Sequence, residues 1–527
     1  MIRYIKEINC TVKQRNTKET ATRLADPKKL LIKNIFSNWA MMFVSIAIAF
    51  FMSPFLVHNL GKEQYGIWAL VLSIVSYSGF LDAGMRQSLA RYIPKYYAVK
   101  DYPKLNQVLS TTDAIYWVTG SLVMLATLVV AFFFIGVFNV TAEYMPVMRI
   151  TLILVGVNEA MRFVFITRSA LGPFHRYDIG NAIDILGTVA NALVVVIFIG
   201  RGYSIITLAV IMVSTFFLKF FIRSIYQKRL VPEIEYKLAH VNKQTFKELF
   251  EYGAVSFFIV VAWMVIFNSD NVIIGMFLNT TDVTYYSIAG MMINYLRTLI
   301  NAIGTPLIPT ISHLEASNNY EEIAGLYTKL SKYLNYLAAC IAIGILFYGG
   351  HFINLWMGEG FKSTVNVLHI LIIPAAIYLP QVVANSVLLG ISRHRTLLKV
   401  LAFEAIIKIV LSVILIKPLG IYGVAIGTAL PQFVIYTFIY PRIFTRIIGL
   451  ELKKYYTMNL KAIAIASALT VPISLLLIYL NKIQGWPGFI ISVITVVIFA
   501  AIGFWKWVIE SWDKEKLLNK LKYRKVS

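Results

Sequence analysis

Cysteine, histidine and acidic side chains are scarce in this chain of 527 residues. It has 2 cysteines and 7 histidines, and 26 Asp and Glu stand against 49 Lys and Arg. Cys10 lies in a polar N-terminal segment and Cys340 in an apolar one, so the two provide no disulfide framework. The histidines show no metal-ligand spacing, and no cysteine pair joins them. We therefore expect no structural disulfide, no bound metal and no cofactor.

Three further absences bear on the class of protein. The chain lacks a G-x-x-x-x-G-K-[ST] phosphate loop, so it should not hydrolyse ATP itself. Residues 1–33 carry nine Lys and Arg and no apolar stretch of the kind found in a cleavable signal peptide. The loops predicted on the side opposite this segment are too short to hold the catalytic groups of a glycan polymerase. These absences predict that the protein is not an enzyme.

Long apolar runs are the dominant feature that is present. Hydrophobic residues make up 58% of the chain and charged residues 14%, against about 25% charged in an ordinary soluble protein. Runs of about 20 apolar residues, long enough to cross a bilayer as helices, recur along the chain. Because a helix satisfies its own backbone hydrogen bonds in lipid, we predict an all-α integral membrane protein. The predicted spans number fourteen: 35–57, 66–88, 112–138, 147–170, 178–200, 203–222, 251–277, 284–310, 333–356, 364–390, 396–416, 420–444, 457–480 and 487–508.

The positive charge is distributed unevenly between the two sides of these spans. Forty of the 49 Lys and Arg lie on the side of the N-terminal tail, six lie on the other side, and three lie inside spans. Because basic loops stay in the cytoplasm, both termini are predicted to be cytoplasmic. The net charge of +23 is explained by topology and contact with anionic membrane lipid, and no motif supports binding of nucleic acid.

A weak internal repeat appears at an offset of about 218 residues. Asp101 and Asn319 are matching helix N-caps, and Glu322 completes a capping box with Asn319. Gly202 matches Gly420 at the same offset. The repeat predicts two pseudo-symmetric six-helix lobes around a central cationic cavity, an architecture typical of transporters.

The repeat also sets the predicted domain boundaries. The segments are a basic tail over 1–33, an N-terminal lobe over 34–222, a cytoplasmic linker over 223–249, a C-terminal lobe over 250–448, and two extra spans with a second basic tail over 449–527.

Three bases lie near the middle of apolar spans, namely Arg162, Arg297 and Lys408. A cation at the centre of a membrane helix costs roughly 2.5–3.5 kcal/mol on insertion scales. We expect these bases to face a shared, water-accessible interior that binds an anionic substrate. Asn294 and Asn301 follow the helical face of Arg297 and are predicted to contribute to the same site.

Each of these bases also has a structural interpretation. Glu159 precedes Arg162 by three residues and Glu404 precedes Lys408 by four, so both pairs can form on one helix face and ease insertion. Arg297 has no acid within a turn, and its structural alternative is a bond to backbone carbonyls or to Asp270 on another helix.

The remaining charged candidates are acids and one helix-end pair. Asp270, Glu404, Glu159 and Asp184 lie in spans and are candidates for coupling an ion or proton, or for pairing with the bases. Asp82 and Arg86 are spaced i, i+4 at one end of the second span. They are predicted to act either as a gate or substrate-access contact or as a simple helix-end pair.

Three N-terminal segments carry a family resemblance. Residues 54–70, PFLVHNLGKEQYGIWAL, followed by LDAG at 81–84 and ARYI at 90–93, resemble the flippases of O-antigen and capsular polysaccharide. These proteins belong to the multidrug/oligosaccharidyl-lipid/polysaccharide exporter superfamily. The resemblance covers the N-terminal third well and depends on helix layout elsewhere.

The resemblance implies a specific activity. Such proteins move undecaprenyl-pyrophosphate-linked oligosaccharide from the inner to the outer leaflet by alternating access, for O-antigen, capsule or exopolysaccharide synthesis. A cationic lumen is implied, with Arg297 as the main contact, and a glycan polymerase and other assembly proteins are implied as partners. The sodium site of the family's lipid II flippase branch uses spans on which Asp270, Glu404 and Thr428 lie here, but Lys408 nearby disfavours a cation.

Three alternatives stay open from the sequence. A lipid II flippase shares the fold and the diphosphate, and differs in the sugar. An ion-coupled multidrug exporter of the same superfamily would favour an acidic rather than a basic cavity. A non-transporting scaffold for glycan assembly would leave the embedded bases unexplained.

Overall fold

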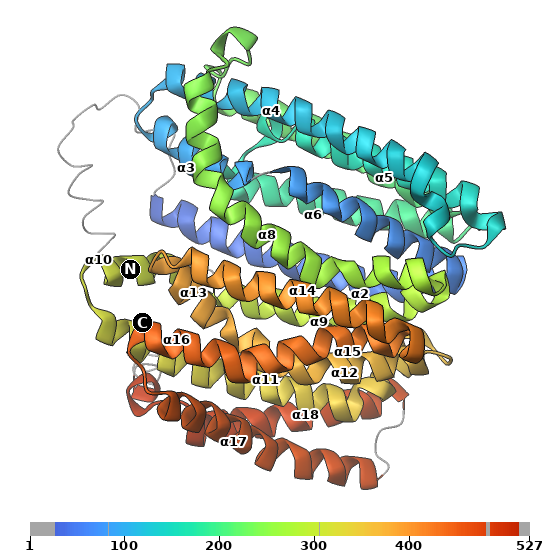
Figure 1. Cartoon of the computed structure of the whole chain (residues 1–527), viewed down its shortest axis with the longest axis vertical. Helices are drawn as coiled ribbons and strands as arrows, with labels where there is room; N and C mark the ends of the chain where they lie inside the picture. The colour runs from blue at the N-terminus through green and yellow to red at the C-terminus, as the bar shows by residue number, and fades with distance from the viewer. Residues whose placement is uncertain (1–26, 83, 305, 481–484, 516–527) are drawn as a thin grey trace.

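The computed structural model describes residues 27–82, 84–304, 306–480 and 485–515 (Figure 1). All regular structure in these ranges is helical. The first half of the chain forms α2 (Pro27–Ser76), α3 (Met85–Ala98), α4 (Tyr102–Val129), α5 (Met145–Val164), α6 (Tyr177–Ile199) and α7 (Ile205–Leu230).

The second half contains more and shorter helices. These are α8 (Lys243–Phe277), α9 (Thr280–Gly304), α10 (Leu307–Ala316), α11 (Tyr320–Met357), α12 (Lys362–Tyr378), α13 (Val382–Gly390), α14 (His394–Leu419), α15 (Ile421–Val434), α16 (Tyr440–Ile448), α17 (Leu452–Tyr479) and α18 (Gly485–Gly503).

Ten helical stretches within the described residues are long and apolar enough to cross a membrane. One of them, Ile32–Asp82, contains two predicted spans, because Gly61 breaks α2 with non-helical angles of φ 80° and ψ 164°. Glycine adopts this left-handed φ without a steric penalty. The predicted spans outside the ten are α5, α9 and α14, which carry the three embedded bases. The all-α membrane architecture is confirmed, and the number fourteen stays a prediction.

The predicted helix starts at the two repeat positions are confirmed. The Asp101 side chain accepts a hydrogen bond from the Lys104 amide at 3.1 Å, which caps α4. Asn319 accepts from the Glu322 amide at 3.2 Å and donates to the Glu322 carboxylate at 2.7 Å, which caps α11. The bond from the Glu322 amide is the predicted cap, but the Asn319 backbone amide donates to the Leu314 carbonyl at 2.9 Å, so the reciprocal half of a capping box does not form.

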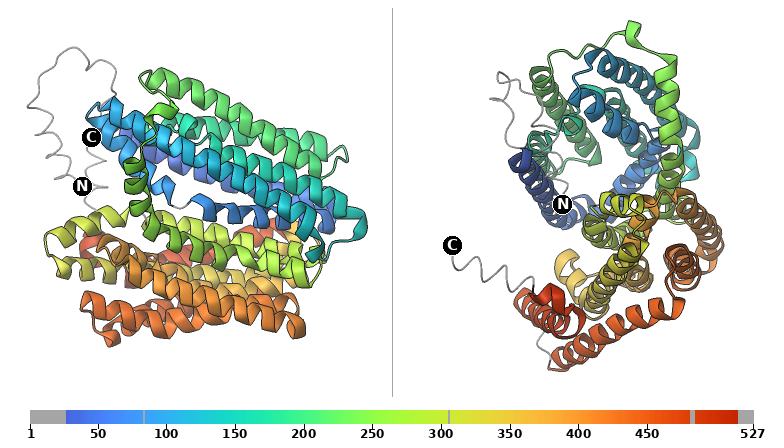
Figure 2. Two further views of the ribbon diagram at one scale, coloured as in Figure 1. Left: turned by 45° about the horizontal axis from the view of Figure 1, so that its top comes forward. Right: turned by 90° about the vertical axis from the view of Figure 1, so that its left-hand side faces the viewer.

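The helices lie roughly side by side, with α4 to α7 at one edge and α17 and α18 at the other (Figures 1 and 2). The helix α8 runs obliquely between the two groups and packs against α3, α9 and α14. The helix α2 packs against both α6 and α9, so it also belongs to the centre of the bundle. The helices α17 and α18 pack mainly against α11.

Several contacts between the two halves lie at the bundle end that carries the short predicted loops. Lys62 donates to the Tyr285 hydroxyl at 3.2 Å and to the Gly360 carbonyl at 3.1 Å. The Asn139 amide donates to the Gly275 carbonyl at 2.9 Å. All these residues lie near predicted loops on the side opposite the N-terminal tail, so the two halves are tied together at that end.

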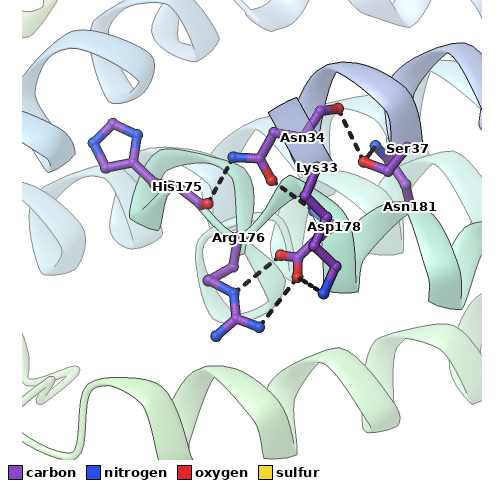
Figure 3. A network of polar contacts seen from close by, with 7 residues as sticks. All are labelled: Lys33, Asn34, Ser37, His175, Arg176, Asp178 and Asn181. Atoms are coloured by element: carbon purple, nitrogen blue, oxygen red, sulfur yellow. Dashed lines mark hydrogen bonds and ion pairs between the residues drawn. The ribbon is translucent and has the colours of Figure 1, made fainter. Parts of the chain in front are cut away.

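A polar network joins the beginning of α2 to the beginning of α6 (Figure 3). The Asp178 carboxylate accepts from Lys33 at 2.8 Å and from Arg176 at 3.0 Å, and its side chain is only 3% exposed. Asn34 donates to the His175 carbonyl at 2.9 Å and accepts from the Asp178 amide at 3.0 Å. The paired charges and satisfied amides fix these helix ends together.

The segment 231–242 between α7 and α8 lies along α4. Asn106 donates to the Glu233 carbonyl and accepts from the Glu235 amide, both at 3.1 Å, and Ser110 donates to the Glu235 carbonyl at 3.2 Å. Burial raises the pKa of the nearby Tyr236 hydroxyl. The helix α7 continues to Leu230 and α8 begins at Lys243, so both helices extend into the predicted linker over 223–249, whose bounds stay a prediction.

Candidate functional site

Arg297 lies on α9 and has neutral partners. Its Nη2 donates to Asn294 Oδ1 at 2.5 Å, one turn earlier on the same helix. Its Cζ lies 3.7 Å from the centre of the Phe267 ring of α8, a close cation–π contact. Among the ion pairs of the described residues, none includes Arg297. The guanidinium is held in place without being neutralised.

Two adjacent cavities share the Arg297 side chain. The larger has a volume of about 260 Å³ and is lined by polar residues that include Asp270, Asn294 and Thr428. The smaller, of about 40 Å³, is lined by Asn301, Glu404 and other residues. Arg297 is the sole basic residue lining either of these two cavities. The predicted cluster of Arg297, Asn294 and Asn301 is therefore brought together around one hollow region.

Lys408 occupies a different environment from the one predicted. Its side chain is 1% exposed and lines neither of these two cavities. Its Nζ lies 2.9 Å from Asp270 Oδ1, donates to Ser269 Oγ at 2.9 Å and to the Val265 carbonyl at 3.3 Å, and also bonds the Ile266 carbonyl. The expectation of a water-accessible Lys408 is corrected, because four oxygens of α8 enclose its ammonium.

Asp270 joins four helices through one carboxylate. It lies on α8, pairs with Lys408 of α14, accepts from the Tyr286 hydroxyl of α9 at 2.8 Å and accepts from the Thr428 hydroxyl of α15 at 3.1 Å. The predicted alternative that Asp270 pairs with Arg297 is wrong in this structure. Sequence reasoning missed Tyr286, because one tyrosine in a span gives no signal of its partner.

Glu404 does not pair with Lys408, although the two are spaced i, i+4. Its Oε2 accepts from the Tyr436 hydroxyl at 2.8 Å, and its residue is 1% exposed. The spacing permits a pair on one helix face, but here the ammonium turns toward α8 and the carboxylate toward Tyr436. Glu404 lines the smaller cavity together with Arg297.

The embedded charges of the first half are paired with one another. Arg162 lies 2.7 Å from Glu159, which confirms the predicted pairing on α5. Asp184 of α6 accepts from Arg223 at 2.5 Å and lies 3.7 Å from Lys219, both on α7. Sequence reasoning did not find these two partners, because they were assigned to the basic end of a span rather than to its interior.

The predicted pair of Asp82 and Arg86 is present at the start of α3. Arg86 Nε lies 3.3 Å from Asp82 Oδ1, and the Arg86 guanidinium lies over the Phe163 ring at 5.5 Å. Asp82 also accepts from the Tyr116 hydroxyl of α4 at 2.9 Å. These contacts agree with a helix-end pair, and the gating role stays a prediction.

The sequence comparison decides the family. Residues 31–315, just over half of the chain, match the family described as "Polysaccharide biosynthesis protein". The chain belongs to this family. Membership makes it a multi-pass membrane transporter of polysaccharide biosynthesis rather than an enzyme.

Similar proteins occur in Bacillus subtilis and Shigella flexneri. The chain is 20% identical over 503 residues to the "Uncharacterized membrane protein EpsK" of Bacillus subtilis, covering 93% of this chain and 98% of that protein. It is 20% identical over 409 residues to the "Putative O-antigen transporter" of Shigella flexneri, covering 75% of this chain and 94% of that protein. Both alignments extend beyond the half that matches the family.

Solved structures show the same fold for this family member. The lipid II flippase MurJ in an inward closed conformation aligns with a TM-score of 0.67 at 13% identity, covering 90% of this chain and 98% of that one. An inward-facing multidrug resistance transporter of the MATE family and MOP superfamily aligns with a TM-score of 0.62 at 13% identity, covering 78% and 95%. The predicted superfamily fold is confirmed.

Proposed function

We propose that the protein is a flippase that moves undecaprenyl-pyrophosphate-linked oligosaccharide from the inner to the outer leaflet of a bacterial plasma membrane. The product would supply O-antigen, capsule or exopolysaccharide synthesis. Family membership and the similarity to the Shigella flexneri protein described as an O-antigen transporter support this proposal. Glycan polymerase and other assembly proteins would be its partners.

The observation that carries the proposal is the unneutralised Arg297 at the junction of two cavities. A diphosphate that leaves water must exchange its hydration shell for fixed positive groups. The planar guanidinium suits phosphate oxygens and stays charged at any working pH. Asn294 and Asn301 supply neutral polar groups beside it, which suit the sugars of the head group.

An apolar cavity on the other side of α9 suits the prenyl chain. It has a volume of about 740 Å³ and is lined almost entirely by apolar side chains of α9, α11 and α18, including Ile303 and Phe489. Because α9 contributes to this cavity and also carries Arg297, one helix separates the apolar surface from the cationic one. The chain could remain in an apolar environment while the head group passes the bundle.

We propose that transport takes place within the predicted topology. Fourteen spans would form two six-helix lobes over 34–222 and 250–448, with both termini in the cytoplasm. The ties made by Lys62 and Asn139 would then close the outer end, and alternating access would require those contacts to break. In Figure 1, α2 begins and α18 ends at the same end of the bundle, which an even number of crossings requires.

Replacement of Arg297 tests the proposed function. In the strain that carries the gene, Arg297→Met should reduce surface polysaccharide while lipid-linked oligosaccharide accumulates on the cytoplasmic face. Loss of a desolvated charge partner costs about 2 kcal/mol or more, so export should fall at least about thirtyfold. Arg297→Lys should keep part of the activity, because it keeps the charge and loses the bidentate geometry.

Two results would refute the proposal. One is normal surface polysaccharide from an Arg297→Met protein that reaches the membrane in wild-type amounts. The other is accumulation of lipid II, rather than the surface-polysaccharide intermediate, when the gene is deleted, which would favour the lipid II alternative. Loss of drug resistance alone on deletion would favour the multidrug exporter.

A further inference from the structure

Arg297 and Asp270 line the same cavity and yet do not pair. Arg297 packs on the Phe267 ring, and Phe267 precedes Asp270 by three residues on α8. Residues three apart are neighbours on a helix surface, about 5–6 Å apart between Cβ atoms. Both charged side chains line the cavity of about 260 Å³. Because no other acid lines this cavity, Asp270 is the acid that could pair with Arg297 from within it.

The structure shows what prevents that pairing. The Asp270 carboxylate is turned toward α14 and α15, where Lys408 and Thr428 bond to Oδ1 at 2.9 and 3.1 Å. Tyr286 donates to Oδ2 at 2.8 Å. The Lys408 ammonium, 1% exposed and surrounded by oxygens, neutralises the carboxylate from the side away from the two cavities.

We propose that Lys408 is an internal counter-ion that holds Asp270 away from Arg297 and thereby leaves Arg297 free for an anionic ligand. Lys408 is then a positioning residue rather than a substrate contact. This inference rests on the proposed function for the identity of the ligand, a diphosphate. It does not rest on that function for the arrangement of the three charges.

The proposal predicts different effects on diphosphate binding when Lys408 or Asp270 is replaced. Lys408→Met leaves a carboxylate that is free to neutralise Arg297, so binding of a diphosphate should weaken. Asp270→Asn leaves an additional cation near the cavity, so binding should stay the same or tighten. A purely structural pair would weaken binding in both variants, because either change leaves one buried charge alone.

The binding test uses farnesyl diphosphate as the probe. The full-length protein in lipid nanodiscs is titrated with it by calorimetry at constant ionic strength. We expect Lys408→Met to raise the Kd at least tenfold and Asp270→Asn not to raise it. A similar rise in both variants would overturn the proposal. Equal binding by wild type and Arg297→Met would instead count against the proposed function.

A substrate-free measurement tests the arrangement itself. In the wild type, Arg297→Met removes an unpaired cation, so the thermal midpoint should stay the same or rise. In the Lys408→Met background, Arg297 should have become the partner of Asp270, so the same change should lower the midpoint. A double-mutant cycle isolates this difference. Equal effects of Arg297→Met in both backgrounds would overturn the proposal whatever the probe does.

A charge-neutral variant covers the case in which Lys408→Met does not fold. Lys408→Met/Asp270→Asn buries no net charge and leaves Arg297 unpaired, as in the wild type. It should bind farnesyl diphosphate with a Kd within threefold of the wild-type value. Loss of binding in a folded double variant would show that Lys408 itself contacts the ligand, and the proposal would fail.

Discussion

The charged side chains embedded in helices α2 to α7 have different kinds of partner from those embedded in helices α8 to α16. In the first group, Arg162 pairs with Glu159 on its own helix, and Asp184 pairs with Arg223 on the next helix. In the second group, Arg297 has neutral partners only, while Lys408 takes its acid from a different helix. Both groups carry bases, but only the second exposes an unneutralised one to the polar cavities described here.

The difference comes down to one side chain on each helix. Arg162 has a carboxylate three residues earlier, at Glu159, and Arg297 has an amide three residues earlier, at Asn294. The donor–acceptor distances of the two hydrogen bonds are similar, 2.7 Å for Arg162 and 2.5 Å for Arg297. A carboxylate neutralises the base that it orients, whereas an amide orients the base and leaves its charge. Orientation without neutralisation is what an anion-binding arginine requires.

Among the variants that change the partners of these charges, Asn294→Asp should have the largest effect, because it gives Arg297 the partner that Arg162 already has. The new carboxylate would occupy the place of the amide oxygen and form a charge-assisted pair. We expect export to fall at least tenfold, since a diphosphate would have to displace a bound carboxylate, a difference of about 1.4 kcal/mol. Lipid-linked oligosaccharide accumulating in the cells measures the loss.

Asn294→Ser is the matched control for that change. It removes most of the orienting bond without adding charge, so export should fall less than in Asn294→Asp. Equal losses in the two variants would mean that the amide contact, rather than the free charge of Arg297, is what matters. That result would remove the distinction between the two groups of helices.

Sequence reasoning found the elements of this contrast and missed their arrangement. Arg297 could be singled out because no acid lies within a turn of it, and the Glu159–Arg162 pair could be predicted from its spacing. For Lys408 the spacing indicated Glu404 on the same helix, and nothing in the sequence linked it to Asp270 on another helix, which is its partner in the structure. Only packing decides between a local and a distant acid, and α14 packs closely on α8.

The fold also has features that neighbouring residues determine and features that depend on contacts between distant segments. The helical character of the apolar runs and the caps at Asp101 and Asn319 are local properties, and the structure confirms them. The end of α7 at Leu230 is also local, because Pro232 disfavours a helical Val231, but the path of segment 231–242 along Asn106 and Ser110 of α4 is a distant property. No pattern in either segment alone reveals that contact.

Asp184→Asn should have an intermediate effect, mainly on stability. It leaves Arg223 and Lys219 of α7 facing each other without an acid between them. A fully buried pair would lose about 3–5 kcal/mol, but these side chains are 24–29% exposed, so about 1–2 kcal/mol is expected. A lower thermal midpoint of the purified protein measures it.

The double variant Asp184→Asn/Lys219→Met checks the cause of that loss. Removal of one base should relieve the repulsion between Lys219 and Arg223, so the thermal unfolding midpoint should rise part of the way back to the wild-type value. A midpoint as low as that of the single variant would show that the hydrogen bond, and not the charge, stabilises the first group of helices. Export per folded protein should be close to normal in both variants, because Asp184 and Lys219 line neither of the two cavities that share Arg297.

Glu159→Gln should have the smallest effect and gives the sharpest test of the comparison. It gives Arg162 the kind of partner that Arg297 has, an amide three residues earlier, and so leaves a second base unneutralised. The pair is half-exposed, with Arg162 45% exposed, so stability should change by only about 0.5 kcal/mol. Export should change less than about twofold, because Arg162 lines neither cavity that Arg297 shares.

Glu159→Ala serves as the control, since it removes both the charge and the orienting bond. If the two variants export normally, an unneutralised base outside the cavities does not contribute to export. Export would then depend on the position of Arg297 at the cavities as well as on its lack of an acidic partner. A tenfold gain or loss in Glu159→Gln, absent in Glu159→Ala, would mean that an oriented Arg162 also meets the substrate. Arg162 and Arg297 would then both bind the anionic substrate, as the sequence predicted. The two groups of helices would differ only in how strongly each arginine binds it.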